Sequence, residues 1–567
     1  MVRYSTRTAL RVKKSSTKIG RVLPGRFQQP NLARRARFLK PMTLGEVPIR
    51  SRAVCNFLAT RRQGCIVRAV YPIDLIRHND PELFFALVAP VGADADRVCD
   101  GLEEVLKHFN YKLEVIRVIE QLKRVKGYLD SDPEFFDDRI KNRMDEGDRF
   151  RSETSRDDAL ALLSVLSILG FRERHGSTDP VPRQAYLFRS LKRPEEVNAL
   201  RRIYGSNLIV IGAHSGRGKR VDNLAERIAN SHFSAQRDKF RDKAETLIIR
   251  DESDESKEHG QRLRQAFSLA DFFLDSSTFQ EIEGGLRRFL DLLFGKPVIT
   301  PTRDELGMAH AYIAAMRSSE MGRQVGAAIT DRRGNLIAVG TNEVPKAHGG
   351  YYSDGDALDG RDWSRGFDSS DYYKKSNLGE LLQALSDEKL LRQDLNDIPT
   401  PEQIKLVSPV LKQTRYMQLI EFIRAMHAEV GALVDAARRG VPVTDSTIYV
   451  TTFPCHECAR NLVGAGVARV VYIEPYAKSL ALELHDDAVQ LDASTDINKI
   501  PFTPFLGVSP RNYPMIFGMP QRKDREGNVI EWQATTASPR VSGSFWSYLR
   551  YEKEDLNFLR DSLNLKV

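Results

Sequence analysis

The chain has 567 residues, of which 41% are hydrophobic and 28% are charged. This length is too great for one hydrophobic core and predicts two to four domains, while the composition is that of a globular protein. No apolar run reaches membrane-spanning length and no secretory signal is recognisable, so we expect a cytoplasmic protein with no membrane partner. Five scattered cysteines are too few for a disulfide framework, which agrees with a reducing compartment.

The net charge of +9 is concentrated at the start of the chain. Residues 1–52 contain 14 Lys and Arg and one acid, a charge of +13, so the rest of the chain carries −4. This segment has little periodicity, and we expect residues 1–64 to be a basic and largely disordered tail. A nucleic-acid-binding arm, which would gain from counterion release, and an organelle transit peptide remain open as interpretations.

Residues 65–300 alternate between strand patterns and helix patterns. Leu83–Val88 is a continuous apolar run typical of a buried parallel strand, and a glycine turn follows it at Ala89–Asp94. Ala95–Phe109 then has one apolar face, and Leu113–Ile116 predicts the next strand. Strand, turn, helix and strand make a βαβ unit, so we expect an α/β domain with a P-loop-like parallel sheet.

Two loops of this domain resemble phosphate-binding loops, and both depart from the Walker A pattern. The loop that starts at Gly92 is acidic and lacks the lysine that contacts the β- and γ-phosphates. The loop Gly212–Arg220 has Ala213 in place of the first glycine, and Arg220 in place of the Ser or Thr that holds magnesium. A nucleotide bound by the basic loop and a simple surface turn are both open interpretations, and we do not expect ATP hydrolysis.

Residues 301–567 predict a second α/β domain, and we place the boundary at Pro297–Pro301. A β-hairpin is expected over Val325–Gly340, and an insert at 345–412 that begins rich in Gly, Asp and Tyr interrupts the pattern. The other elements expected here are two helices, Leu378–Leu391 and Met417–Arg439, and two strands, Ser446–Val450 and Arg469–Ile473.

A metal-binding motif follows the insert. The residues His427–Glu429 and Pro454–Cys458 form the pattern H-x-E…P-C-x-x-C, which is the signature of zinc-dependent nucleobase and nucleotide deaminases. The pattern offers three ligands, His427, Cys455 and Cys458, and leaves the fourth tetrahedral position for water, as catalysis requires. We therefore expect one Zn²⁺ per chain, and a closed zinc knuckle is the alternative interpretation of this spacing.

Glu429 lies two residues after the histidine ligand, where a carboxylate that binds no metal can move protons. We expect Glu429 to be the catalytic residue: it takes a proton from the zinc-bound water, delivers it to N3 of cytosine and assists the departure of ammonia. The hydroxide attacks C4 of the base, and the product is uracil.

The C-terminal half resembles the cytidine/deoxycytidylate deaminase superfamily, and specifically its deoxycytidylate branch. The resemblance rests on the zinc motif together with Arg323–Ala327, Gly340–Asn342 and Tyr472. It implies a three-layer α/β/α fold, in which Asn342 binds the deoxyribose hydroxyl and Tyr472 lines the pocket.

Over about residues 70–520 the chain resembles a narrower group, the bacterial anti-phage dCTP/dCMP deaminases. The matching stretches include Ser190–Val197, Ile423–Glu429, Tyr472–Ser479 and Pro504–Pro510. This group joins a nucleotide-kinase-like domain to a deaminase domain. The resemblance implies removal of dCTP and dCMP during infection, which starves phage DNA synthesis, and silencing of the enzyme by a small inhibitory RNA.

Further substrate contacts are expected outside the zinc motif. Lys478 and Arg323 are candidates for binding a substrate phosphate, and the acids from Asp354 to Asp362 are candidates for ordering Mg²⁺ with a triphosphate substrate. For each of them an ordinary surface role is an open alternative. We also expect the protein to form a homo-oligomer.

Two other functions remain open. The same zinc chemistry on RNA or single-stranded DNA would make a polynucleotide cytidine deaminase, which the basic N-terminal segment favours. The second is a nucleotide-sensing or RNA-binding regulatory protein with a vestigial deaminase centre. The intact motif residues His427, Glu429, Cys455 and Cys458 argue against this second alternative.

Overall fold

The computed structural model describes residues 80–176, 178–254, 257–411, 414–476, 479–491, 496–519, 521–541 and 545–563. The expected basic tail at residues 1–64 therefore lies outside the described residues. The chain divides into two units, Met1–Val70 and Tyr71–Val567, and the described residues all belong to the second. Within them, no helix is both long enough and apolar enough to cross a membrane.

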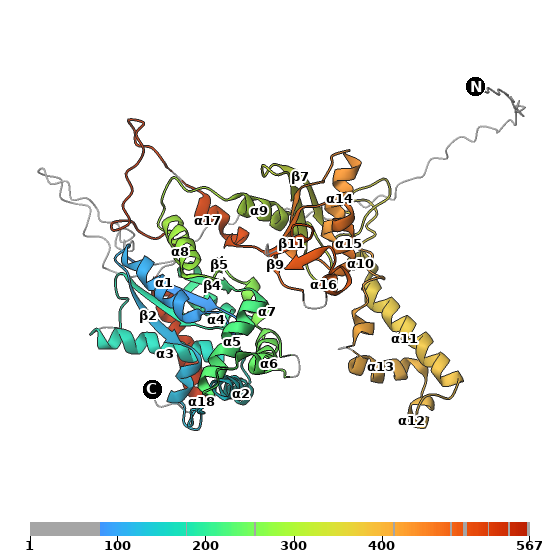
Figure 1. Cartoon of the computed structure of the whole chain (residues 1–567), viewed down its shortest axis with the longest axis horizontal. Helices are drawn as coiled ribbons and strands as arrows, with labels where there is room; N and C mark the ends of the chain where they lie inside the picture. Colours follow the sequence, from blue (N-terminus) through green and yellow to red (C-terminus); the bar gives the residue numbers. More distant parts are fainter. Residues whose placement is uncertain are drawn as a thin grey trace, which may run out of the picture. The chain divides into compact units, whose positions relative to one another are not determined.

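The first sheet is the parallel sheet that the sequence predicts. Its strands lie in the order β12-β5-β4-β1-β3-β2, and all neighbours are parallel except β12 and β5 (Figure 1). Every residue of the central strand β1 is buried, because helices cover both faces of the sheet. The strands are β1 Leu83–Val88, β2 Lys112–Arg117, β3 Gln184–Arg189, β4 Leu208–His214, β5 Phe272–Asp275 and β12 Gly507–Val508.

Side chains cap the starts of α1 and α8. Asp94 accepts a hydrogen bond from the backbone N–H of Arg97, and Thr278 accepts one from the backbone N–H of Glu281. The α-helices are α1 Ala95–Lys107, α2 Phe136–Thr154, α3 Ala159–Arg174, α4 Pro194–Tyr204, α5 Arg217–Ser231, α6 Arg241–Glu252, α7 Leu263–Ser268, α8 Phe279–Leu293 and α18 Phe545–Leu563. Short 3₁₀ helices lie at η2 Ile119–Arg124, η3 Gly205–Asn207 and η4 Arg237–Phe240.

The second sheet is mixed, with the order β10-β11-β9-β8-β6-β7. The expected hairpin is confirmed as the antiparallel pair β6 and β7; β6 also pairs antiparallel with β8, and the remaining pairs are parallel. The strands are β6 Gly326–Thr330, β7 Leu336–Thr341, β8 Thr447–Thr452, β9 Arg469–Glu474, β10 Val489–Leu491 and β11 Ile500–Pro504. The helices are α9 Arg303–Ala315, α14 Ala428–Arg438, α15 His456–Gly464, α16 Ala481–Leu484 and α17 Tyr513–Phe517, with η6 at Pro510–Asn512.

Helices cover both faces of the second sheet. Along β8, Tyr449 packs in the same apolar cluster as residues of α9, whereas Ile448 and Val450 pack with residues of α14 and α15. Alternate residues of a strand point to opposite faces, so α9 forms one layer and the pair α14 and α15 forms the other. This helix–sheet–helix arrangement is the three-layer architecture that we expected.

The insert is helical, and two expected helix boundaries are wrong. The helix expected over Leu378–Leu391 is α11, Ser369–Asp387, which begins earlier because the Asp368 side chain caps it. The helix expected from Met417 begins only at Ala428, because the preceding backbone is extended and pairs Met426 with Glu343. The other insert elements are α10 Asp362–Arg365, α12 Gln393–Asn396 and α13 Thr400–Leu411, with η5 at Arg415–Gln418.

Two C-terminal segments pack on the first sheet. Strand β12 pairs with β5, and helix α18 packs against α3 and α4. The second contact contains a buried ionic cluster in which Arg172 bonds Glu82 and Glu552, each at 2.7 Å. All three side chains are fully buried. The domain boundary near residue 300 stays a prediction, but the core of the first sheet includes these later residues.

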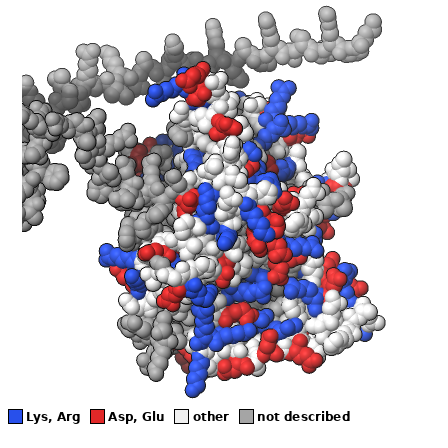
Figure 2. Space-filling view, turned by 90° about the vertical axis from the view of Figure 1, so that its left-hand side faces the viewer, with Lys and Arg blue, Asp and Glu red and all other residues white. Residues whose placement is uncertain are grey.

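The charged surface agrees with the near balance of charge outside the basic tail. On the face drawn in Figure 2, Lys and Arg are interspersed with Asp and Glu, and no large region of one sign is visible. Surface pairs such as Arg97–Asp94 and Arg250–Asp145 illustrate this pattern. Each exposed ion pair therefore contributes little to the stability of the fold, because such pairs are individually weak.

The buried cluster predicts how α18 is anchored. Arg172→Met leaves the carboxylates of Glu82 and Glu552 buried without a counter-charge, and we expect the protein to lose about 3–5 kcal/mol of stability. Glu552→Gln is the matched control. It should cost less, because Arg172 keeps Glu82 as its counter-charge and the amide oxygen can still accept a hydrogen bond from Arg172. Thermal unfolding followed by circular dichroism compares the two, and equal melting temperatures for both variants would contradict the prediction.

Candidate active site

The three expected metal ligands lie at the starts of two helices. His427 is the N-cap residue of α14, and Cys455 is the N-cap residue of α15, whose first turn carries Cys458. The Nδ1 atom of His427 lies 3.3 Å from the Sγ atoms of both cysteines. All three ligand atoms lie within 4.8 Å of one another. One imidazole nitrogen and two thiolates this close fit a tetrahedral zinc ion with one position left open.

Close backbone packing brings α14 to the sheet. A Cβ atom on Gly340 of β7 would lie 2.0 Å from the carbonyl oxygen of Ala428, and one on Gly326 of β6 would lie 2.0 Å from that of Ala311. Both strand positions therefore need glycine, because any side chain would push α14 or α9 away from the sheet. The N-terminus of α14, and with it His427, is thereby held against the end of the hairpin.

The site stabilises the thiolate of Cys455. Hydrogen bonds from Cys458 and His427 lower the pKa of Cys455 to about 4. The backbone N–H of Cys458 also points at this sulfur, 3.4 Å away, as expected for an N-cap residue. Cys455 is thus ready to bind a metal cation as a thiolate near neutral pH.

Glu429 lies in the first turn of α14, beside the ligands. Its side chain is only 4% exposed, and burial raises its pKa to about 7. It lines the same cavity as His427 and Cys455. A carboxyl group of this kind can accept and release a proton near neutral pH, which is what the expected catalytic role requires.

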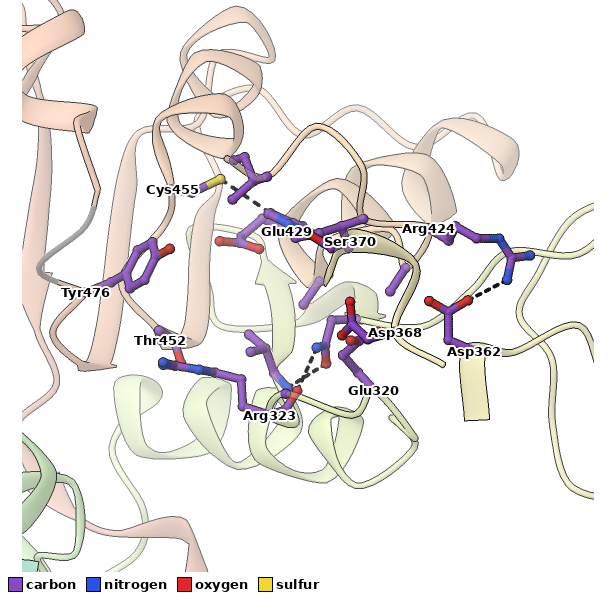
Figure 3. Close-up of a pocket in the computed structure, with 18 of the residues that line it drawn as sticks. Glu320, Arg323, Asp362, Asp368, Ser370, Arg424, Glu429, Thr452, Cys455 and Tyr476 are labelled. Carbon is purple, nitrogen blue, oxygen red and sulfur yellow. Dashed lines mark hydrogen bonds and ion pairs between the residues drawn. The ribbon is translucent and has the colours of Figure 1, made fainter. Parts of the chain in front are cut away.

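Two of the ligands, His427 and Cys455, and Glu429 open into a cavity of about 300 Å³, which is large enough for a small ligand (Figure 3). Its walls come from the deaminase-motif elements, from the segment before α14, and from the insert. The polar and charged lining residues that the sequence analysis did not single out are Glu320, Asp368, Ser370, Asp371, Lys374 and Thr452. No periodicity marks the insert residues among them, because they reach the cavity only through the tertiary packing of the insert.

Two expected substrate residues line this cavity. Asn342 uses its side chain to hold the loop beside it: Oδ1 accepts from the backbone N–H of Val325 at 2.6 Å, and Nδ2 donates to the carbonyl oxygen of Arg323 at 2.8 Å. The Arg323 side chain, 53% exposed, lies 3.4 Å from Glu474. The structure thus places both residues at the cavity, and their substrate roles stay predictions.

A third expected substrate residue, Tyr472, is not among the described residues that line the cavity. Tyr472 packs edge-on against Phe453, which does line the cavity, with ring centroids 4.9 Å apart. Tyr476, four residues later, lines the cavity itself. Lys478 lies outside the described residues.

Three of the four acids expected to order Mg²⁺ have partners in the protein. Asp356 pairs with Lys346, Asp359 with Arg361, and Asp362 with Arg424. Among the described residues, the one group of three or more side chains with metal-ligand spacing is the His-Cys-Cys site. Binding of Mg²⁺ by these acids therefore stays a prediction, and their arrangement does not favour it.

Donor groups in and beside the two phosphate-loop candidates of the first sheet bond to other groups of the protein. The backbone N–H of Val91, in the first loop, donates to a carboxylate oxygen of Asp251 at 2.7 Å. In the second loop, Lys219 donates to the carbonyl oxygen of Ser277, and Arg220 bonds Glu252 at 2.8 Å. Nucleotide binding by this domain stays a prediction. The structure does not favour it, because these donor groups already bond to other groups of the protein.

The geometry predicts a single zinc ion per chain. Elemental analysis of the purified protein should find about one zinc, and Cys455→Ser should lower this value sharply, because two protein ligands bind zinc much more weakly than three. Cys99→Ser is the matched control, since Cys99 is a buried thiol of the first domain. A full zinc content in the Cys455→Ser protein would contradict the assignment.

Comparisons with known proteins agree with this site. Residues 301–474 match the family model described as the cytidine and deoxycytidylate deaminase zinc-binding region. The chain is 39% identical over 62 residues to ComE operon protein 2 of Bacillus subtilis, and 41% identical over 54 residues to the deoxycytidylate deaminase of phage T4. Each match covers 10% of this chain, and 33% and 28% of the relatives. The chain thus spans a third or less of the length of these relatives.

More distant similarities extend further along the chain. A probable deoxycytidylate deaminase of Drosophila melanogaster is 24% identical over 170 residues, which is 30% of this chain and 58% of the relative. The solved dCMP deaminase of cyanophage S-TIM5 is 15% identical with a TM-score of 0.20, covering 36% of this chain and 99% of that one. The C-terminal half of the chain therefore contains a cytidine/deoxycytidylate deaminase zinc-binding domain, whose metal ligands are His427, Cys455 and Cys458.

Proposed function

We propose that the protein is a zinc-dependent hydrolytic deaminase that converts deoxycytidine nucleotides, dCTP and dCMP, to deoxyuridine nucleotides. The observation that carries the proposal is the position of Glu429. This buried carboxyl group lies beside a His-Cys-Cys metal site and lines a cavity of about 300 Å³. A closed structural zinc knuckle would need neither the open coordination position nor the buried acid.

The reaction adds water to C4 of cytosine and releases ammonia. Bound zinc supplies an activated water to the cavity. Glu429 accepts a proton from that water and delivers it to N3 of the base; it then accepts the second proton, from the hydroxyl group now on C4, and passes it to the amino group, which leaves as ammonia. His427 and Cys455 line the cavity together with this carboxyl group, so the base must enter with its amino-bearing edge toward them.

Deoxynucleotides are the substrate class that the residues around the cavity support. The matched relatives include deoxycytidylate deaminases, which share the zinc-binding region. Asn342 and Arg323 line the cavity, and Arg323 is exposed enough to meet a phosphate at its mouth. Discrimination between dCTP and dCMP would then depend on how many phosphate groups of the substrate fit at the mouth of the cavity.

Replacing the catalytic acid tests the activity directly. Glu429→Gln should lower turnover of dCMP and dCTP by about 10²- to 10⁴-fold, because an amide of the same shape cannot carry the proton. Zinc content should stay unchanged. Glu421→Gln, an exposed acid in the segment before α14, is the matched control and should keep full activity.

The assay should compare dCMP, dCTP, CMP, CTP and a cytosine-containing oligonucleotide, and follow the conversion of cytosine to uracil. Turnover of the oligonucleotide alone would favour the polynucleotide deaminase instead. No turnover of any free nucleotide by the wild-type protein would refute the proposal.

A nucleotide deaminase of this kind would deplete the precursor pool that replicating phage DNA needs, and we propose this as its role in a bacterial host. Expression of the wild-type chain should lower phage plaque counts and the cellular dCTP level, whereas the Glu429→Gln chain should lower neither. Equal protection by both chains would show that defence does not depend on deamination.

A further inference from the structure

The start of helix α11 forms one wall of the active-site cavity. Five residues of this part of the insert line the cavity, and Figure 3 shows two of them, Asp368 and Ser370, facing the side that holds Glu429. The wall is held in place at the helix start. The Asp368 side chain accepts from the N–H of Asp371 at 2.8 Å, and Asp362 accepts from the N–H of Ser369 at 2.8 Å.

Two side chains of this wall have no partner in the described part of the protein. Ser370 is only 8% exposed, yet its hydroxyl makes no hydrogen bond there. Lys374 is half-buried, and its ammonium group makes no hydrogen bond or ion pair with any described residue. A buried hydroxyl that is left unpaired costs free energy, so its position is best explained by a ligand that bonds it.

Ser370 and Lys374 lie on one face of α11, because they are four residues apart. The rise of the helix places Lys374 about 6 Å further along the axis. Ser370 is the more deeply buried of the two, and Lys374 lies nearer solvent. This separation resembles that between the sugar of a nucleotide and its 5′-phosphate.

The other charges of the cavity decide where an anion can bind. Two of the acids that line it already interact with other groups of the protein: Asp362 pairs with Arg424 at 2.6 Å, and Asp368 caps α11. Glu320 also lines the interior, and burial raises its pKa. An interior lined by acids repels a phosphate but suits sugar hydroxyls and the cytosine amino group. Three Lys and Arg side chains are among the described residues that line the cavity; Arg424 pairs with Asp362 and Arg323 lies 3.4 Å from Glu474, which leaves Lys374 as the cation of this lining with no acidic partner to compete with a phosphate.

We propose that α11 recognises the nucleotide at two points: the Ser370 hydroxyl bonds the nucleoside part, and the Lys374 ammonium group binds the 5′-phosphate. This inference rests on the proposed function and adds two specificity residues that come from the insert rather than from the zinc motif. Ser370 contributes to binding of any deoxycytidine compound. Lys374 makes the site prefer nucleotides over nucleosides.

Ligand-binding measurements on a variant that cannot catalyse the reaction separate the roles of Ser370 and Lys374. In the Glu429→Gln background, calorimetric titration with dCMP and with deoxycytidine gives both affinities without reaction. Lys374→Gln should weaken dCMP binding by about 10- to 100-fold, the loss expected for a bond to a charged group, and leave deoxycytidine binding unchanged. Lys375→Gln, its exposed neighbour on α11, is the matched control and should change neither.

Ser370→Ala should weaken the binding of dCMP and of deoxycytidine alike, by about 3- to 10-fold, because it removes one neutral hydrogen bond. Ser376→Ala, an exposed serine on the same helix, is its control. Circular dichroism and zinc content establish that each variant is folded. Unchanged dCMP affinity in Lys374→Gln, or an equal loss for both ligands, would overturn the inference.

These failures are distinct from failure of the proposed function. If the wild-type chain binds dCMP with the predicted Lys374 dependence but forms no dUMP, the function is wrong and the binding inference stands. If the wild-type chain deaminates dCMP while Lys374→Gln binds it normally, the inference is wrong and the function stands. If the Glu429→Gln chain binds neither dCMP nor deoxycytidine, the inference is overturned.

Discussion

The site depends on two helices that begin at metal ligands. His427 and Cys455 are N-cap residues with extended backbones, so each precedes a helix whose free N–H groups point toward the ligands. This arrangement favours the Cys455 thiolate and places Glu429 within the first turn of α14. The metal site and the acid are therefore positioned by the same helix start, and a shift of α14 would displace both.

Glycine makes that position possible. Gly340 lets the backbone of α14 approach β7 at a distance that no side chain would permit, and Gly326 does the same for α9 on β6. The hairpin is thus packed between two helices, and its strand ends carry Asn342, which holds the loop through Arg323.

Buried charges connect the later part of the chain to the first sheet. Glu305, at the start of α9, is fully buried; it accepts from the N–H of Val508 at 2.9 Å and pairs with Arg288 at 2.7 Å. Arg172 holds α18 through Glu552 in a similar way. Removing one partner of such a cluster is costly, because the other charge is left buried and unpaired. The phosphate-like loops of this sheet are likewise filled by protein carboxylates, as Asp251 illustrates.

The sequence by itself determined the chemistry of the site, because ligand identity and local spacing are enough to specify a zinc centre: His427, Cys455 and Cys458 converge as the motif predicts. It also predicted the parallel sheet and the hairpin, which depend on local apolar patterns and turns. It did not predict that α14 begins only at Ala428, since the pairing of Met426 with a distant strand end overrides helical periodicity.

Only the tertiary structure decided what surrounds the zinc. Ser370 and Lys374 are far from the motif in sequence and belong to a helix whose expected start was wrong, so no spacing rule could bring them to the cavity. Asn342 was expected at the pocket, but only the structure shows that the neighbouring backbone engages its amide group. Contacts between distant segments depend on how whole elements pack, and a linear pattern of residues does not carry that information.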